Sequence, residues 1–208
     1  RIRKQLDRFE AARKRVWKGK TRPEAVHLAS SAAALGMPAA AYDLVRIGTA
    51  AYGIWPSPDV HNLYLANSSG RKHNPLERVL SWKTDVMQVK DVAQGEFVGY
   101  GTAFEASRDM RIAVIPLGYA NGYPRGMSNR GHVLIHGRKA PVIGSVNMNM
   151  FMVDVSNIPR TGVGDEVVLI GRQKKNVISL RSFTEFTSAL NNEFVSRLPT
   201  AIPRRIVR

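Results

Sequence analysis

Cysteine is missing from the 208-residue sequence, and acidic residues are scarce. The absence of cysteine excludes disulfides and thiolate metal sites, and it fits a protein of the reducing cytoplasm. No apolar run approaches the length that crosses a bilayer, so no membrane association is expected. The five histidines show no metal-ligand spacing, and no P-loop, GxGxxG or GxSxG motif occurs. The sequence therefore predicts neither a metal site nor a nucleotide-binding loop.

Basic residues gather at the two ends of the chain. The formal net charge is +15, from 31 Lys and Arg against 16 Asp and Glu. Residues 1–22 hold ten of these cations and two acids, and residues 197–208 hold four arginines and no acid. Because the rest of the chain is nearly balanced, nucleic acid is not the expected partner of the protein as a whole. Binding of RNA or an acidic partner by the ends alone stays open.

The hydrophobic pattern changes along the chain. Residues 2–16 have apolar side chains at helical spacing, and residues 25–50 show the strand, helix, strand rhythm of parallel α/β folds. Residues 56–75 are rich in Pro, Asn, Ser and Gly, which predicts a long loop at a domain boundary. Short strands are then predicted at 80–89, 97–103, 111–117, 131–136, 140–146, 150–155 and 166–170, and a helix within 179–198. The expected fold is α/β followed by an antiparallel β-barrel or β-sandwich.

The apolar strand 111–117 runs directly into a turn, 118–125, that carries two glycines and a proline. Tyr119 is therefore placed where a buried strand ends, and its phenol can face a cavity. A tyrosine at such a position can take or give a proton. The alternative is a packing residue whose hydroxyl donates to a backbone carbonyl.

Anion-binding chemistry is suggested by two strand ends. Ser30 and Ser31 precede a predicted short helix, and Gly48 and Thr49 follow the next strand. Hydroxyls and free N–H groups at such positions bind phosphate, although helix capping alone would also explain the serines. Arg46 interrupts an otherwise apolar strand. It needs a hydrogen-bond acceptor if that strand is internal, and only solvent if the strand is outermost.

A third polar feature precedes the predicted strand 150–155. Asn147, Met148 and Asn149 follow Gly144 closely and form a predicted strand entry. Backbone amides at this position can bind a carboxylate, whereas an ordinary polar turn is the simpler interpretation.

Taken together, several ordered runs resemble the C-terminal half of a fold-type III, PLP-dependent alanine racemase. They are Ala29-Ser-Ser-Ala-Ala33, Asp43-Leu-Val-Arg-Ile-Gly48 with Tyr52-Gly53, Gly99-Tyr-Gly-Thr102, 116–125, 139–144 with Asn147-Met148-Asn149, and Val163-Gly-Asp165 with Leu169-Ile-Gly171. The likeness covers about residues 25–205. It implies that residues 1–60 are the last βα units of a PLP-binding TIM-type barrel. Residues 76–208 would be the family's mainly antiparallel C-terminal β domain.

The resemblance also implies roles for individual residues. Tyr119 matches the tyrosine that acts as a catalytic acid/base in the partner subunit's site of a homodimer. Arg46 matches the arginine that faces the pyridine nitrogen of pyridoxal 5'-phosphate. Met148 matches the residue whose backbone amide meets the carboxylate of the amino-acid substrate. The residues that match the phosphate cradle are Ser31, Gly48, Thr49 and, more loosely, Thr200.

Some positions depart from the family. The PLP-binding lysine would precede Arg1, so this chain alone is expected to be inactive. Asn121 and Asn149 stand where the family usually has Asp, Ser30 stands where it has Asn, and an insertion lies around 61–74. The expected function is the C-terminal portion of a cytoplasmic alanine racemase that interconverts L- and D-alanine. The alternatives are a catalytically silent scaffold whose basic ends bind RNA or an acidic partner, and an amino-acid racemase of broader specificity.

Overall fold

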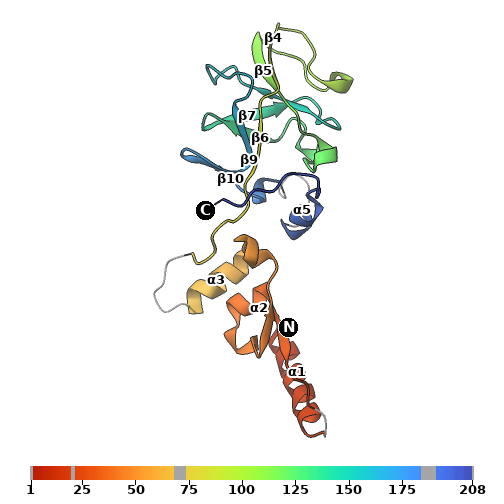
Figure 1. Cartoon of the computed structure of the whole chain (residues 1–208), viewed down its shortest axis with the longest axis vertical. Coiled ribbons are helices and arrows are strands. Elements are labelled where there is room, and N and C mark those ends of the chain that lie inside the picture. The colour runs from red at the N-terminus through yellow and green to blue at the C-terminus, as the bar shows by residue number, and fades with distance from the viewer. Residues whose placement is uncertain (1, 20–21, 68–73, 184–190, 208) are drawn as a thin grey trace. The chain divides into compact units, whose positions relative to one another are not determined.

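Two compact units make up the chain, Arg1–Val79 and Leu80–Arg208. A computed structural model (Figure 1) describes residues 2–19, 22–67, 74–183 and 191–207. None of the helices within these ranges is long and apolar enough to cross a membrane.

The first unit contains helices and a small parallel sheet. Its elements are α1 (Ile2–Trp17), β1 (His27–Ser30), α2 (Ser31–Gly36), the 3-10 helix η1 (Pro38–Ala40), β2 (Leu44–Arg46), the 3-10 helix η2 (Thr49–Tyr52) and α3 (Pro58–Asn67). Strands β1 and β2 pair in parallel, with Ser30 opposite Arg46, and α2 forms the connection between them. The βα rhythm predicted for residues 25–50 is therefore confirmed.

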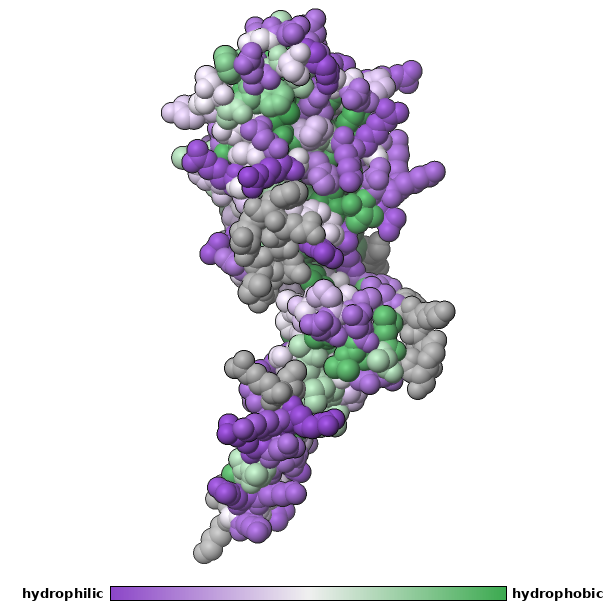
Figure 2. Space-filling view, turned by 180° about the vertical axis from the view of Figure 1, so that it is seen from behind, coloured by the Kyte–Doolittle hydropathy of each residue, from purple (hydrophilic) through white to green (hydrophobic). Residues whose placement is uncertain are grey.

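Helix α1 contacts the rest of its unit through one side. The Phe9 ring lies 5.2 Å from that of Tyr42, and the Tyr42 hydroxyl donates to the carboxylate of Glu10. Arg13 also donates to Glu10, at 3.0 Å, and its guanidinium lies 5.5 Å from the Tyr42 ring. The remaining cations of α1 are left at the surface. In Figure 2 hydrophilic residues cover most of the visible face of this helix.

Residues 56–75 contain helix α3, so the prediction of a continuous loop was wrong. The Ser57 hydroxyl accepts a hydrogen bond from the Val60 N–H at 3.3 Å, as an N-cap residue does. Pro58 occupies the first helical position, where no N–H donor is needed and the fixed φ suits the helix. The serine and proline that indicated a loop are thus the start signal of a helix.

The second unit is built on one eight-stranded sheet. Its elements are β3 (Trp82–Asp85), β4 (Gln88–Val92), the 3-10 helix η3 (Tyr100–Thr102), β5 (Met110–Ile115), the 3-10 helices η4 (Tyr119–Asn121) and η5 (Arg125–Met127), β6 (His132–Ile135), β7 (Arg138–Ile143), β8 (Phe151–Asp154), β9 (Glu166–Gln173), β10 (Asn176–Ile178) and α5 (Asn191–Arg197). Of the helix predicted within 179–198, α5 forms the last part, and residues 184–190 lie outside the described residues.

The strands follow the order β10-β9-β6-β7-β8-β5-β4, and β3 also pairs with β9. Every pairing is antiparallel, so the expected antiparallel β domain is confirmed. Residues 112–115 of β5 and 167–170 of β9 are buried on both faces. This explains why both strands appear in the sequence as continuous apolar runs, without the alternation of a half-exposed strand.

The predicted strand 80–89 is two strands, β3 and β4. The break falls at two residues whose N–H groups donate to different partners. Val86 donates to the Asp165 carbonyl at 2.9 Å, whereas Met87 donates to the Val114 carbonyl at 2.9 Å. The chain therefore leaves β9 and joins β5 within two residues, which a single alternating pattern does not reveal.

No continuous strand forms over 97–103, and that prediction was wrong. Phe97 makes an isolated bridge to Glu105, and η3 follows. Gly99 and Gly101 have φ angles of 85° and 76°, in the left-handed region that favours glycine. These two glycines turn the backbone out of the extended conformation.

Candidate active site

Tyr119 lies on η4, directly after the buried strand β5. Its side chain is 46% exposed. The turn around it closes on itself, because the Tyr123 N–H donates to the Gly118 carbonyl at 3.1 Å. The Gly118 N–H donates to Oδ1 of Asn121 at 3.1 Å, and Gly122, with φ of 94°, ends the 3-10 helix. A closed, capped turn thus presents the phenol at the surface of the second unit.

The loop that carries Met148 packs directly on this turn. The Tyr119 N–H donates to the Asn147 carbonyl at 3.1 Å, and the Ala120 N–H donates to the Met148 carbonyl at 3.0 Å. A Cβ atom at Gly118 would lie 2.2 Å from the Asn147 oxygen, so only glycine allows this approach. The structure therefore joins the two residues of this unit, Tyr119 and Met148, that were singled out in separate motifs.

Thr200 belongs to the same unit. It is exposed, in the segment that follows α5. Its neighbours Pro199 and Ala201 line a pocket of about 310 Å³ together with Ala120 and Asn121 of the Tyr119 turn. The segment of Thr200 therefore lies beside the Tyr119 turn, whereas the other residues matched to a phosphate cradle are in the first unit.

In the first unit, Ser31 and Gly48 are in direct contact. The buried Ser31 Oγ accepts a hydrogen bond from the Gly48 N–H at 3.0 Å, and Thr49 begins η2. A Cβ atom at Gly48 would meet nothing within 4 Å, so the space beside this glycine is open. The first N–H groups of a helix have no acceptor within it. Ser31, Gly48 and Thr49 thus lie together at the start of a 3-10 helix, and the space next to Gly48 is open.

Arg46 is exposed at the end of β2, and its guanidinium is held by the neighbouring strand. Nη1 lies 2.6 Å from Nδ1 of His27, and Nη2 donates to the Leu28 carbonyl at 3.3 Å. Because an arginine side chain keeps its protons, Nδ1 of His27 is the acceptor. His27 was not predicted from the sequence as the partner of Arg46. The βα rhythm of residues 25–50 predicts that β1 and β2 pair in parallel, and this pairing could have indicated that His27 lies next to Arg46.

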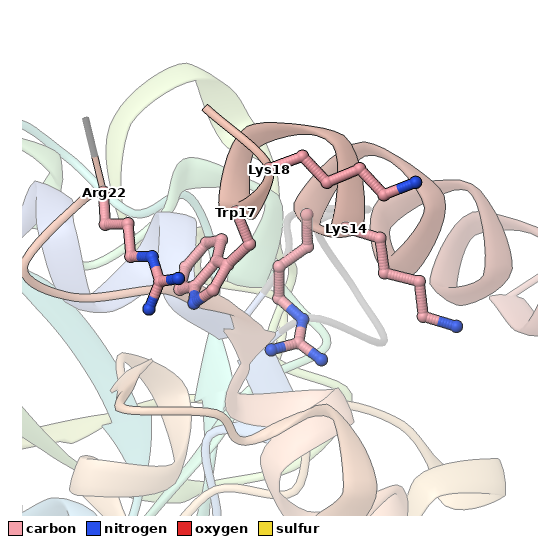
Figure 3. A pocket seen from close by; sticks show the side chains of 5 residues that line it. Lys14, Trp17, Lys18 and Arg22 are labelled. Carbon is pink, nitrogen blue, oxygen red and sulfur yellow. The ribbon is translucent and has the colours of Figure 1, made fainter. Parts of the chain in front are cut away.

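A separate pocket of about 350 Å³ lies along α1 and is lined by Arg13, Lys14, Trp17, Lys18 and Arg22. Figure 3 shows the Trp17 indole and the Arg22 guanidinium along this pocket, whereas the ammonium groups of Lys14 and Lys18 point away from it. Every polar side chain in the lining except the indole is cationic. The pocket suits an anion with a flat apolar group.

Family models match both parts of the chain. Residues 79–206 match the C-terminal domain of alanine racemase, and residues 1–56 match its N-terminal domain. The first match alone covers more than half of the chain. This chain belongs to the alanine racemase family, a family of racemase-type enzymes.

Curated relatives agree in sequence. The chain is 41% identical over 178 residues to the alanine racemase of Halothermothrix orenii, covering 86% of this chain and 44% of that protein. It is 39% identical over 200 residues to the alanine racemase of Symbiobacterium thermophilum, covering 96% of this chain and 50% of that protein. The chain therefore spans about half the length of the curated relatives it matches.

Solved structures agree in fold. The alanine racemase of Bacillus anthracis with bound L-Ala-P matches 100% of this chain and 51% of its own, at 30% identity and a TM-score of 0.87. The alanine racemase of Bartonella henselae with covalently bound pyridoxal phosphate matches 94% of this chain and 50% of its own, at 30% identity and a TM-score of 0.74. The α/β part followed by an antiparallel β domain is therefore the fold of this family.

Proposed function

We propose that this chain is the C-terminal portion of a PLP-dependent alanine racemase that interconverts L- and D-alanine, with Tyr119 as one of its two proton carriers. One observation carries the proposal most strongly. The turn of Tyr119 and the loop of Met148 are joined by two backbone hydrogen bonds, of 3.1 and 3.0 Å. A proton-carrying phenol and a backbone amide for a carboxylate are thus presented together, as the chemistry on an amino acid needs.

The residues of the first unit fit the cofactor's phosphate. Ser31 supplies a hydroxyl, Gly48 and Thr49 lie at the start of η2, and the space beside Gly48 is open. Hydroxyls and helix-initial N–H groups are the usual donors to a phosphate dianion. Thr200 would add a hydroxyl from the second unit. When bound, pyridoxal phosphate supplies an electron sink for the Cα–H bond of the substrate.

Arg46 would face the pyridine nitrogen of that cofactor. Its guanidinium can only donate, so it pairs with a ring nitrogen that carries no proton. His27 and the Leu28 carbonyl fix its orientation from the neighbouring strand. A fixed donor at this position would disfavour protonation of the ring nitrogen of a bound cofactor.

Tyr119 would take or give the Cα proton on one face of the substrate through its exposed phenol oxygen. The Met148 amide would orient the substrate carboxylate, and in a homodimer each copy would supply Tyr119 to the other copy's site. The opposite proton carrier is the PLP-binding lysine of the family. Since no lysine of this chain matches it, we expect the 208 residues alone to racemise nothing.

The test uses a protein that carries this chain with a complete N-terminal domain. Tyr119→Phe should lower L- to D-alanine exchange by at least about a hundredfold, as loss of a general acid/base does. Tyr100→Phe is the matched control, because Tyr100 is also exposed, at 79%, and is not part of the proposed site. Wild-type exchange in Tyr119→Phe would refute the proposal. Other L-amino acids run in parallel would reveal broader specificity.

A second candidate function is RNA binding by α1. It is favoured by the pocket in which Trp17 lies with the guanidinium groups of Arg13 and Arg22, since a stacking aromatic with cations suits single-stranded RNA. The chain should then bind an RNA oligonucleotide with an affinity that falls steeply with salt. Trp17→Leu should weaken this binding. Trp55→Leu is the control, because the Trp55 ring lies against the His61 ring, at 4.5 Å, and does not line this pocket. Equal binding by both variants, or none by the wild type, would remove this function.

A further inference from the structure

Two buried aromatic rings lie beneath the joined loops of the second unit. Tyr123 and Phe151 are both 0% exposed, and their rings stack with centroids 4.3 Å apart and planes 12° apart. Tyr123 follows η4 by two residues, and Phe151 is the first residue of β8, directly after the loop of Met148. The stack therefore connects the two loops at the points where each enters the core.

Backbone hydrogen bonds close each of the two loops next to the residue that carries its stacked ring. The Tyr123 N–H closes the Tyr119 turn on the Gly118 carbonyl, at 3.1 Å. The Asn147 N–H closes the other loop on the Met150 carbonyl, at 2.9 Å, one residue before the stacked phenylalanine. Since the two loops are also bonded to each other, a shift of either ring would move the whole assembly.

The surroundings leave the Tyr123 ring little room. The Phe183 ring meets it edge-on at 5.6 Å, and the Trp82 ring lies 6.2 Å away. A Cβ atom at Gly131 would lie 2.8 Å from the Tyr123 hydroxyl, so the backbone passes close to the end of the ring. A smaller side chain in place of Tyr123 would leave a cavity under the Tyr119 turn, and the turn would lose its support.

We propose that Tyr123 is a positioning residue, whose ring stacked on Phe151 sets the place of the Tyr119 phenol relative to the Met148 amide. This inference rests on the proposed function. Tyr123 does not exchange the proton itself, because it is fully enclosed and touches no solvent. Burial also raises the pKa of its phenol far above the working range, so the group stays protonated and neutral. The exposed Tyr119 would thus exchange the proton, and the buried Tyr123, four residues later, would hold the turn in place.

Amide hydrogen exchange tests the support directly, without any cofactor. The Ala120 N–H donates to the Met148 carbonyl, so its exchange in the full 208-residue chain reports whether the two loops stay together. We expect Tyr123→Leu to speed this exchange by at least about tenfold. Tyr123→Phe keeps the ring and should leave the exchange rate unchanged. If Tyr123→Leu does not fold, Phe151→Leu removes the same stack from the other side.

Turnover tests the consequence, in the protein with a complete N-terminal domain. Misplacement of a reacting group by about 1 Å can cost on the order of a hundredfold in rate. Tyr123→Leu should therefore lower kcat by about ten- to a hundredfold and change KM by less than about threefold. Tyr123→Phe keeps the ring and should have the kcat of the wild type. A purely structural role would lower the amount of folded enzyme and leave kcat per folded molecule unchanged.

The outcomes separate this inference from the proposed function. Unchanged Ala120 exchange or unchanged kcat in the leucine variants overturns the positioning role, whatever Tyr119→Phe does. Full turnover in Tyr119→Phe overturns the proposed function. Tyr123 would then have no catalytic phenol to position. Faster exchange together with a lower kcat in Tyr123→Leu, rescued in Tyr123→Phe, supports both.

Discussion

Gly118→Ala is the substitution that tests most directly whether the Tyr119 turn and the Met148 loop form one unit. The backbone of Gly118 is extended, with φ of −148°, so alanine fits the local conformation. The added methyl group would nevertheless lie 2.2 Å from the Asn147 oxygen and 2.3 Å from the Met148 oxygen. Both are backbone atoms that cannot rotate away. The methyl group therefore has to push the two loops apart.

The expected loss has two parts. Separating the loops breaks two backbone hydrogen bonds, which are worth about 0.5–1.5 kcal/mol each. Forcing an extra carbon into a packed contact costs about 1–3 kcal/mol. We therefore expect the free energy of unfolding to fall by roughly 2–6 kcal/mol, which corresponds to a drop in Tm of roughly 4–24 °C for a protein of this size.

Calorimetry of the full chain measures this loss. Gly162→Ala is the matched control, because a Cβ atom there would meet nothing within 4 Å and its φ lies outside the left-handed region. Its Tm should change by no more than about 2 °C, as for an open surface site. If Gly118→Ala unfolds at the same temperature as Gly162→Ala, the loops are not packed as described. The close approach of Gly118 to the Asn147 and Met148 carbonyls would then contribute nothing to stability.

Three further predictions concern single side chains. Tyr123→Phe removes a hydroxyl that has no hydrogen-bond partner among the described residues, so the Tm should stay equal or rise. Asn121→Asp keeps an acceptor for the Gly118 N–H and should cost less than about 0.5 kcal/mol, whereas Asn121→Ala should cost about 1 kcal/mol. The Gly162 N–H, 2.7 Å from the Asp165 carboxylate, lowers the pKa of that carboxyl. Asp165 therefore stabilises the fold above about pH 4, and this contribution is lost as the pH falls. Asp165→Asn should lower the urea midpoint at pH 7 and much less at about pH 3.

Each of these predictions has a contradicting result. A clear drop in Tm for Tyr123→Phe would mean that the hydroxyl has a stabilising partner. Equal losses for the two Asn121 variants would mean that the capping bond does not matter. A constant gap between wild type and Asp165→Asn from pH 7 to pH 3 would mean that the carboxylate charge contributes nothing to stability.

Local sequence patterns were enough for most of the regular elements. The helical spacing of residues 2–16 predicts α1, and the apolar runs within 111–117 and 166–170 predict the buried strands β5 and β9. Local patterns failed where one residue type has two uses. Ser57 and Pro58 start a helix and also occur in loops, so α3 was missed.

The residue types of the candidate site were also readable from the sequence, but their neighbours were not. Tyr119, Arg46 and Met148 were each singled out by a local motif that allowed a plain structural interpretation as well. Their partners are distant in sequence or on another strand. Arg46 is held by His27, 19 residues earlier, across a parallel strand pair.

The kinds of elements, the family and the residue types available for chemistry can be predicted from the sequence alone, because they depend on side-chain periodicity and on motifs of a few residues. The contact between the Tyr119 turn and the Met148 loop, and the Tyr123–Phe151 stack beneath both, are visible only in the folded chain. Those contacts depend on strand order, since β5 and β8 must pair before the ends of the two loops can meet. The pairing of strands so far apart along the chain is set by the packing of the whole sheet and not by any short stretch of residues.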